Sequence, residues 1–241
     1  MSKKFKAIVI DNQNNEFSRK ISELDITQLK DGNVLVKIDY SGLNYKDALI
    51  LKDGGRIVKN YPFVPGIDFS GEVEESEDNK FKKGDRVILT GFRVGEIYYG
   101  GFSQYAKVNA DFLVKAPNNL TNHQSMMMGT AGLTALLCAF AIKAKEELLL
   151  GEKVKDVLVT GATGGVGSVA VMVLNKMGYT VHAVTGKKDK HNYLKDLGAT
   201  HILDRSEFLG ESKLLEKGIW DGVVDTVGGE ALTKILAQTN I

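Results

Sequence analysis

The sequence predicts an α/β protein with a β-rich, barrel-like first half and a second half built on a parallel sheet. Up to about residue 121, short alternating or apolar stretches are separated by turn residues, which is typical of a small β-barrel. Beyond that point apolar strands alternate with helical stretches, the pattern of parallel strands joined by right-handed crossovers. We therefore expect two domains, 1–121 and 122–241.

The strands of the first domain follow a short apolar N-terminal strand. Residues 34–40 alternate in polarity, which places Val34, Val36 and Ile38 on one face. Turns such as Lys83-Gly84-Asp85 separate the remaining stretches. Further short strands are expected at 66–74, 86–89, 105–108 and 113–115.

The second domain is expected to contain strands of a Rossmann sheet at 157–160, 180–184, 201–204 and 222–226, with helices at 166–177, 190–197 and 230–238. A complete Rossmann sheet has roughly six strands in the order 3-2-1-4-5-6. Because the chain ends after the helix that follows the fourth strand, we expect a domain that is C-terminally incomplete.

Composition excludes several classes of partner. Lys and Arg number 31 and Asp and Glu 30, so the net charge attracts neither nucleic acid nor an anionic membrane. The single cysteine, Cys138, excludes an internal disulfide framework and favours a reducing compartment. Residues 126–142 carry no charge, but glycines and threonines interrupt them, so we expect a buried helix between the domains. The protein should be soluble and cytoplasmic.

The most informative stretch is VLVTGATGGVGSVA at 157–170, where a buried strand runs into a glycine-rich turn and then a helix. Glycines let the backbone approach an anion, and the first N–H groups of the helix attract it. The spacing is a variant of the dinucleotide-binding fingerprint. We therefore expect Thr163, Gly164, Gly165 and Val166 to bind the phosphates of a dinucleotide; the alternative is a tight turn that only packs the helix on the strand.

The end of the second strand favours NADP(H) over NAD. A dinucleotide site for NAD has an acid about twenty positions past the glycines, which binds the ribose 2′-hydroxyl. Here Thr185, Gly186 and Lys187 stand at that position, followed by Lys188, and they suit a 2′-phosphate. In the alternative interpretation these are solvated turn lysines, and Asp189 leaves room for NAD.

Thr226 and Gly228 follow the fourth expected strand. Ligands of doubly wound sheets bind in the crevice at the carboxyl ends of the strands, so Thr226 is a further candidate for cofactor binding. A plain turn is the alternative.

Several motifs resemble the medium-chain dehydrogenase/reductase superfamily. They are VPGIDFSGEV at 64–73, KKGDRV at 82–87, GGFSQYAKV at 100–108, GTAGLTALLC at 129–138 and the glycine turn. SGLNYKDAL at 41–49 and VTGKKDKHNYLKDLGA at 184–199 resemble the zinc-free, quinone-oxidoreductase-like branch, and within it the acrylyl-coenzyme A reductases. The resemblance implies a GroES-like catalytic domain, a Rossmann domain, NADPH and a homodimer. It also implies members that continue for about two further strands and a tail.

No metal is expected. Zinc-dependent relatives carry Cys-His where this chain has Asn44-Tyr45, and Gly-His-Glu where it has Gly66-Ile67-Asp68. A catalytic zinc needs three convergent ligands, which Asn44 and Ile67 do not supply. The histidines show no ligand spacing, and one cysteine is too few for a structural zinc lobe.

The chemistry expected without zinc is reduction of an activated C=C bond, because the cofactor carries the difficult step and the protein orients it. By resemblance, Tyr45 lies beside the nicotinamide and positions the cofactor or donates a proton; otherwise it is a packing tyrosine. Asn44 either supports this site or, with Asp47 three residues on, caps a helix. Lys46 is treated as a residue of the helix face.

The substrate remains open between an enoyl thioester such as acrylyl-coenzyme A and a quinone or α,β-unsaturated ketone. Arg56 and Lys59 are candidate cations for the phosphates of coenzyme A. The alternative from another class is a truncated, non-catalytic NADPH-binding remnant.

Overall fold

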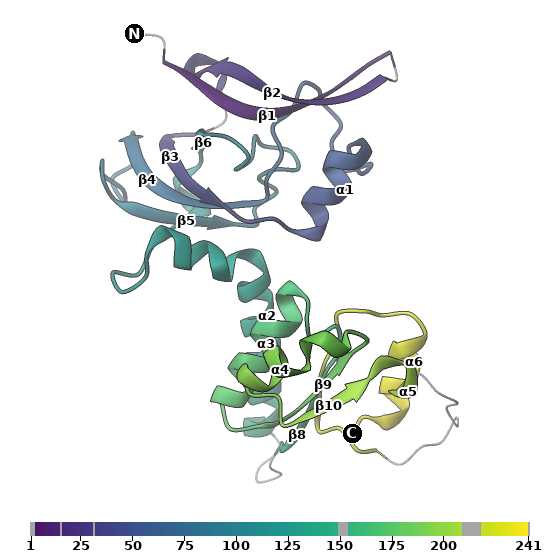
Figure 1. Cartoon of the computed structure of the whole chain (residues 1–241). Coiled ribbons are helices and arrows are strands. Elements are labelled where there is room, and N and C mark those ends of the chain that lie inside the picture. The colour runs from purple at the N-terminus through teal and green to yellow at the C-terminus, as the bar shows by residue number, and fades with distance from the viewer. Residues whose placement is uncertain (1–2, 15, 31, 149–153, 209–217, 241) are drawn as a thin grey trace. The chain divides into compact units, whose positions relative to one another are not determined.

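The computed structural model describes residues 3–14, 16–30, 32–148, 154–208 and 218–240. The chain divides into two compact units, Met1–Thr130 and Ala131–Ile241 (Figure 1). The division falls inside the long helix α2 (Asn122–Leu148), whose first residue opens the second of the two expected domains.

The first unit contains two antiparallel sheets. One is a hairpin of β1 (Lys4–Gln13) and β2 (Glu16–Asp25). The other has five strands in the order β6-β3-β4-β5-β7. Its strands are β3 (Val34–Ser41), β4 (Asp68–Ser76), β5 (Arg86–Thr90), β6 (Tyr105–Val108) and β7 (Leu113–Lys115). Short 3-10 turns η1 (Ile26–Gln28) and η2 (Ala110–Phe112) and the helix α1 (Tyr45–Asp53) complete the unit.

The alternation expected along β3 holds only in part. Val34 and Val36 are buried in the main core of the unit, beside Phe69, as the pattern predicted. Leu35 is also buried, in a second cluster that contains Phe5. Leu35 is therefore the exception to the alternation, because Lys37 and Asp39 are exposed while Ile38 packs against the main core as predicted. The strand β2 was not expected, because its sequence EFSRKISELD is polar and largely exposed.

The second unit has a parallel sheet in the order β10-β9-β8-β11. Its strands are β8 (Asp156–Val159), β9 (Thr180–Thr185), β10 (His201–Asp204) and β11 (Gly222–Val224). In chain order this is 3-2-1-4, the first part of a Rossmann sheet, as predicted. The helices are α3 (Gly165–Lys176), α4 (His191–Asp196), α5 (Arg205–Phe208) and α6 (Glu230–Gln238), with the 3-10 turn η3 (Lys188–Lys190).

Helices cover both faces of this sheet (Figure 1). Ala135 of α2, Leu174 of α3 and Leu194 of α4 pack on one face, in a cluster with Val157 and Val159. Phe208 of α5 and Ile235 of α6 pack on the other, in a cluster with Leu158 and Val184. The apolar run of β8 is therefore buried from both sides, as a central parallel strand requires.

The helix α2 is broken at Gly129, whose φ of 47° and ψ of −152° are not helical. By length and composition alone α2 could cross a membrane, a test that the core helix of a soluble protein also passes. Only 28% of its most apolar window is buried, and Leu137 and Phe140 are 61% and 60% exposed. The expectation of a buried helix is therefore wrong for much of its apolar surface.

Asp221 joins the starts of β8 and β11. Its carboxylate accepts hydrogen bonds from the N–H groups of Lys155 at 2.9 Å and Asp156 at 3.0 Å, and from Asn240 Nδ2 at 2.8 Å. Burial raises the pKa of Asp221, but these hydrogen bonds outweigh it and hold the pKa below its ordinary value. The ionised carboxylate therefore stabilises this end of the sheet.

We expect Asp221→Asn to lower the free energy of unfolding of the second unit by about 1–3 kcal/mol near neutral pH, because an amide replaces an acceptor oxygen by a donor. The pKa is lower in the folded state, so this stabilisation is present above the unfolded value of about 3.9 and is lost as pH falls through the folded value. Urea unfolding of both proteins between about pH 7 and pH 3 measures it. The exposed Asp196→Asn is the control, and equal stability at neutral pH would contradict the prediction.

Candidate functional site

The turn after β8 is a close approach of backbone to backbone. A Cβ atom at Gly167 would lie 2.3 Å from the carbonyl oxygen of Gly161, so α3 can start this close to the strand only with glycine there. Gly161 has a φ of 55°, and a Cβ there would lie 2.3 Å from Thr226 Oγ1. The turn therefore has the tight geometry that its glycine spacing predicts.

The helix α3 begins without a capping side chain. Its N-cap is Gly164, which makes no side-chain cap bond. The first N–H groups of a helix have no partner within the helix. In α3 these groups belong to Gly165, Val166 and Gly167, which the glycine motif places next to the strand. Such a helix start attracts an anionic group such as a phosphate.

A cavity of about 220 Å³ lies beside this turn. It brings together the predicted residues Thr163, Thr185, Gly186 and Lys187. Apolar side chains from β9, α5, α6 and the segment after β11 complete its wall, as expected of a site that holds a planar base. The other lining residues are Thr160, Gly161, Val184, Arg205, Phe208, Val227 and Ala231.

Two cations of this cavity are unpaired. Neither Lys187 nor Arg205 forms an ion pair within the part of the chain that the structure describes. By contrast, Lys188 lies 3.9 Å from Asp204, and Lys190 lies 3.4 Å from Asp189. The lysine run is therefore not a uniform solvated turn, because Lys187 lines the cavity while its neighbours have acidic partners.

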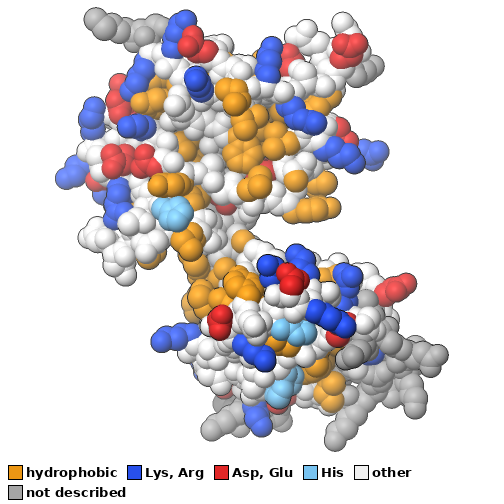
Figure 2. Space-filling view, in the orientation of Figure 1, with side chains coloured by type: hydrophobic (Ala, Val, Ile, Leu, Met, Phe, Trp, Pro, Cys, Tyr) orange, Lys and Arg blue, Asp and Glu red, His pale blue; other side chains and the backbone are white. Residues whose placement is uncertain are grey.

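The guanidinium of Arg205 lies over Gly186. A Cβ at Gly186 would come within 3.3 Å of Arg205 Nε. A second cavity of about 300 Å³ shares Thr163 and Lys187 with the first. Figure 2 shows Lys and Arg side chains gathered on the face of the second unit that is turned to the viewer.

Arg205, Phe208, Val227 and Ala231 were not expected at the site. A signal for Arg205 was present in the sequence, since a basic residue directly follows the strand β10 at its carboxyl end. Nothing comparable marked the apolar residues. Phe208 belongs to α5, a four-residue helix too short to be recognised from periodicity.

Thr226 supports the turn from the neighbouring strand. Its hydroxyl donates to the carbonyl of Thr160 at 2.9 Å, and its backbone N–H donates to the hydroxyl oxygen of Thr160 at 3.0 Å. The Thr160 hydroxyl also donates to Asp225, and Gly228 N–H donates to Asp225 Oδ2 at 2.9 Å. The structure thus gives Thr226 a bonded role in holding the turn, whereas its role in cofactor binding stays a prediction.

The other predicted residues lie in the first unit, at the start of α1. Tyr45 is the first residue of this helix and its side chain is 82% exposed. Asn44 is the N-cap and forms a capping box with Asp47, in which Asn44 N–H donates to Asp47 Oδ2 at 2.8 Å. The amide Nδ2 of Asn44 donates to Asp68 Oδ2 at 3.1 Å. The cap that the Asn44 and Asp47 spacing predicted is present.

Asp47 is fully buried. Its Oδ1 accepts from the N–H of Ile67 at 3.0 Å. Burial raises the pKa of Asp47, although its hydrogen bonds with Asn44 and Ile67 oppose this, and the charge of Asp68 raises it further. The start of α1 is thus anchored on a carboxylate at a position where burial disfavours charge.

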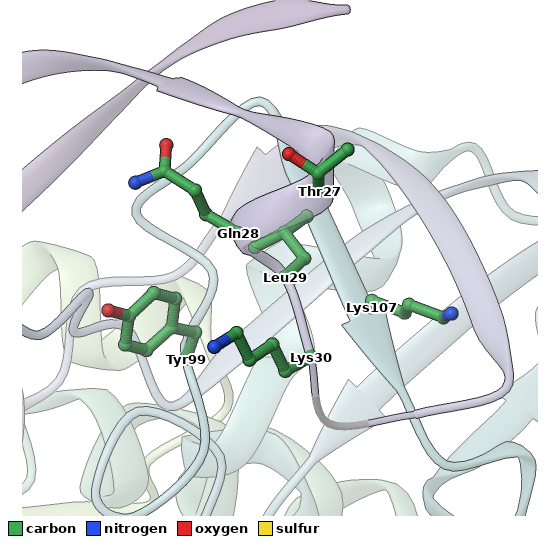
Figure 3. Close-up of a pocket in the computed structure, with 6 residues that line it drawn as sticks. All are labelled: Thr27, Gln28, Leu29, Lys30, Tyr99 and Lys107. Atoms are coloured by element: carbon green, nitrogen blue, oxygen red, sulfur yellow. The ribbon is translucent and has the colours of Figure 1, made fainter. Parts of the chain in front are cut away.

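The remaining candidate cations of this unit lie at its surface. Lys46 Nζ pairs with Glu96 Oε1 at 2.7 Å, as a residue of the helix face would. Arg56 and Lys59 are exposed on the segment after α1. A cavity of about 370 Å³ lies elsewhere in this unit, where Figure 3 shows the amine of Lys30 directed toward Tyr99. Its lining comprises Thr27, Gln28, Leu29, Lys30, Tyr99 and Lys107, without the glycine turn that marks the nucleotide cavity.

The described side chains do not form a metal site. Within the described ranges, no group of three or more His, Cys, Asp or Glu is arranged to hold a metal ion. At the positions where zinc-dependent relatives carry ligands, Asn44 donates a hydrogen bond and Asp68 accepts one from it. These residues do not fit a catalytic zinc.

Two family models match the chain. The alcohol dehydrogenase GroES-like domain matches residues 30–118, and the model named zinc-binding dehydrogenase matches residues 165–241. Acrylyl-CoA reductase AcuI of Ruegeria pomeroyi is 48% identical over 97% of this chain and 71% of its own length. The putative quinone oxidoreductase YhfP of Bacillus subtilis is 43% identical over 99% of this chain and 72% of its own length.

Solved structures agree with these relatives. The yhdH oxidoreductase of Salmonella enterica in complex with NADP has a TM-score of 0.90 at 46% identity, covering 98% of this chain and 71% of that one. The B. subtilis protein yhfP with NAD bound has a TM-score of 0.91 at 41% identity, with the same coverage. The predicted fold, enzyme class and family of nicotinamide cofactor are confirmed. The chain belongs to the medium-chain dehydrogenase/reductase superfamily of oxidoreductases.

Proposed function

We propose that the chain is an NADPH-dependent, metal-free reductase of a C=C bond activated by a carbonyl group, with acrylyl-coenzyme A as the first candidate substrate. The observation that carries the proposal is the cavity beside the glycine turn, in which Lys187 and Arg205 lie beside Thr185 and have no ion-pair partner among the described residues. It is supported by a relative that is 48% identical and named acrylyl-CoA reductase.

The cavity and the neighbouring start of α3 divide the work of binding. The start of α3, with Gly164, Gly165 and Val166, suits the pyrophosphate. Thr185, Gly186 and Lys187 suit the 2′-phosphate, with Arg205 as a second cation. Thr163 lines the cavity directly before the start of α3, and its hydroxyl can donate to a phosphate. The chain thus has more positive charge at the ribose end than NAD requires.

Bound NADPH supplies a hydride to the β-carbon of the substrate. The chain must then supply a proton to the α-carbon, and Tyr45 is the residue that we propose for this step. Its side chain is exposed, and its backbone is held by the cap of α1, so the hydroxyl can reach a ligand without disturbing the helix. Asn44 is proposed to support Tyr45 by fixing the first turn of α1.

A quinone or α,β-unsaturated ketone is the second candidate acceptor, because a relative at 43% identity is named putative quinone oxidoreductase. Both acceptors use the same hydride donor and differ in what receives it. Arg56 and Lys59 would favour the thioester if they contact the phosphates of coenzyme A. The homodimer and the cytoplasmic location stay predictions.

We expect Lys187→Ala and Arg205→Ala each to weaken NADPH binding by roughly 10-fold or more while changing NADH binding less than about twofold, because a charge-assisted hydrogen bond to phosphate is worth about 1.5–3 kcal/mol. Titration of both cofactors against nicotinamide fluorescence measures the ratio. Lys195→Ala, an exposed lysine of α4, is the matched control. A parent chain that binds NADH as tightly as NADPH would contradict the assignment.

We expect Tyr45→Phe to lower kcat for NADPH oxidation with acrylyl-coenzyme A by about 100-fold, the lower range for loss of a proton donor, with little change in NADPH affinity. Loss of cofactor absorbance with acrylyl-coenzyme A or a quinone identifies the acceptor. Tyr40→Phe is the control, because the Tyr40 ring packs in a tilted arrangement against His123, with ring centroids 5.1 Å apart, and the substitution keeps that ring. An unchanged rate removes Tyr45 from the mechanism, and NADPH binding without turnover of either acceptor favours a non-catalytic binding protein.

A further inference from the structure

Asp68 is a buried carboxylate without a cation. It begins β4 and is 1% exposed. Within the described part of the chain it forms no ion pair with Lys, Arg or His. An isolated buried carboxylate costs several kcal/mol unless hydrogen bonds compensate it, so a neutral residue would be the cheaper choice at a purely structural position.

Three N–H groups from two segments, the loop before α1 and the break in α2, converge on this carboxylate. Gly42 N–H donates to Oδ1 at 3.0 Å, and Asn44 Nδ2 donates to Oδ2 at 3.1 Å. Thr130 N–H donates to Oδ2 at 2.8 Å. Thr130 follows the break of α2 at Gly129, so the carboxylate also lies at the N-terminus of the helical segment that continues from there.

Glycines form the cradle around the carboxylate. A Cβ at Gly42 would lie 2.4 Å from Asp68 Oδ1, and a Cβ at Gly129 would lie 2.9 Å from Oδ2. Gly129 also has a φ of 47°, a conformation that favours glycine. The loop before α1 and the break in α2 are therefore both shaped around the two oxygens of Asp68.

The consequence concerns Tyr45. Asp47 holds the backbone of Asn44, and Asp68 holds its side chain. Asn44 is thus restrained at two points, and the exposed Tyr45 follows it directly. A capping box needs only the two reciprocal bonds between Asn44 and Asp47, so the further bond to Asp68 exceeds what the helix requires.

We propose that Asp68 is a positioning residue, which fixes Asn44 and thereby the hydroxyl of Tyr45 relative to the start of the second segment of α2. The proposal rests on the proposed function, because positioning matters only if Tyr45 meets the substrate. Misplacement of a reacting group by about 1 Å can cost on the order of 100-fold in rate.

The test is a double-mutant cycle on the whole chain, with Asp68→Asn, Asn44→Ser and the pair. Serine keeps the N-cap but is too short to reach Asp68. We expect Asp68→Asn to lower kcat with acrylyl-coenzyme A by about tenfold or more, with NADPH affinity changed less than about twofold. In the Asn44→Ser background the same change should cost less than about twofold. Additive losses, or a rate within about twofold of the parent, would overturn the proposal.

The control is Asp39→Asn, which alters a carboxylate that bonds Asn122 Nδ2 at 2.6 Å but touches neither Asn44 nor Tyr45. If Asp68→Asn fails to fold, or the parent chain turns over no acceptor, amide hydrogen exchange of Asn44→Ser decides. We expect exchange at Gly42 and Ala48 to rise about tenfold, with the strand β8 unchanged. Unchanged exchange at Gly42 and Ala48 overturns the positioning proposal, whereas an inactive parent with faster exchange overturns only the proposed reaction.

Discussion

The approach of the α3 backbone to the carbonyl of Gly161 is the contact on which the nucleotide half of the structure depends. At Gly167 there is no room for a side chain, since a Cβ would lie 2.3 Å from that oxygen. Bringing the helix this close aims its unsatisfied N–H groups along the end of β8 and leaves the cavity between that end and β9. The same approach lets α3 pack on the sheet through small residues such as Ala170, so the tight turn and the core packing have one cause.

Two buried carboxylates organise the other unit in a different way. Asp47 and Asp68 have no cationic partner in the described ranges, and their oxygens accept N–H groups instead. Burial raises the pKa of Asp47, and the charge of Asp68 raises it further. The N–H dipoles that compensate them come from a loop, a cap and a helix break, so the carboxylates fix segments that regular secondary structure leaves free.

Most elements of the parallel sheet could be predicted from sequence, because its strands are apolar runs of the expected length and its turn residues are glycines. In this unit β10 and α6 have the expected bounds. In the antiparallel sheet of the first unit β6 and β7 do as well. The strand β2 could not be predicted, because a hairpin strand that is largely exposed and carries many charges has no apolar signal. The prediction that α2 is buried was wrong for a related reason. Composition measures how apolar a helix is, whereas its exposure depends on which elements pack against it.

The residues of the candidate sites also divide into those that the sequence predicted and those that it did not. Thr163, Thr185, Gly186 and Lys187 lie together at one cavity, as expected, because the turn and the strand end that carry them are each contiguous in sequence. Arg205 and Asp68 act across the fold: one reaches Gly186 from the end of the neighbouring strand, and the other joins residues as distant in sequence as Gly42 and Thr130. Arg205 left a partial signal, since a basic residue directly follows β10, whereas nothing in the sequence marks Asp68 as the acceptor of N–H groups from Gly42 and Thr130. Contacts between segments far apart in the chain are set by tertiary structure, so the sequence conceals them even where its glycine turn is plain.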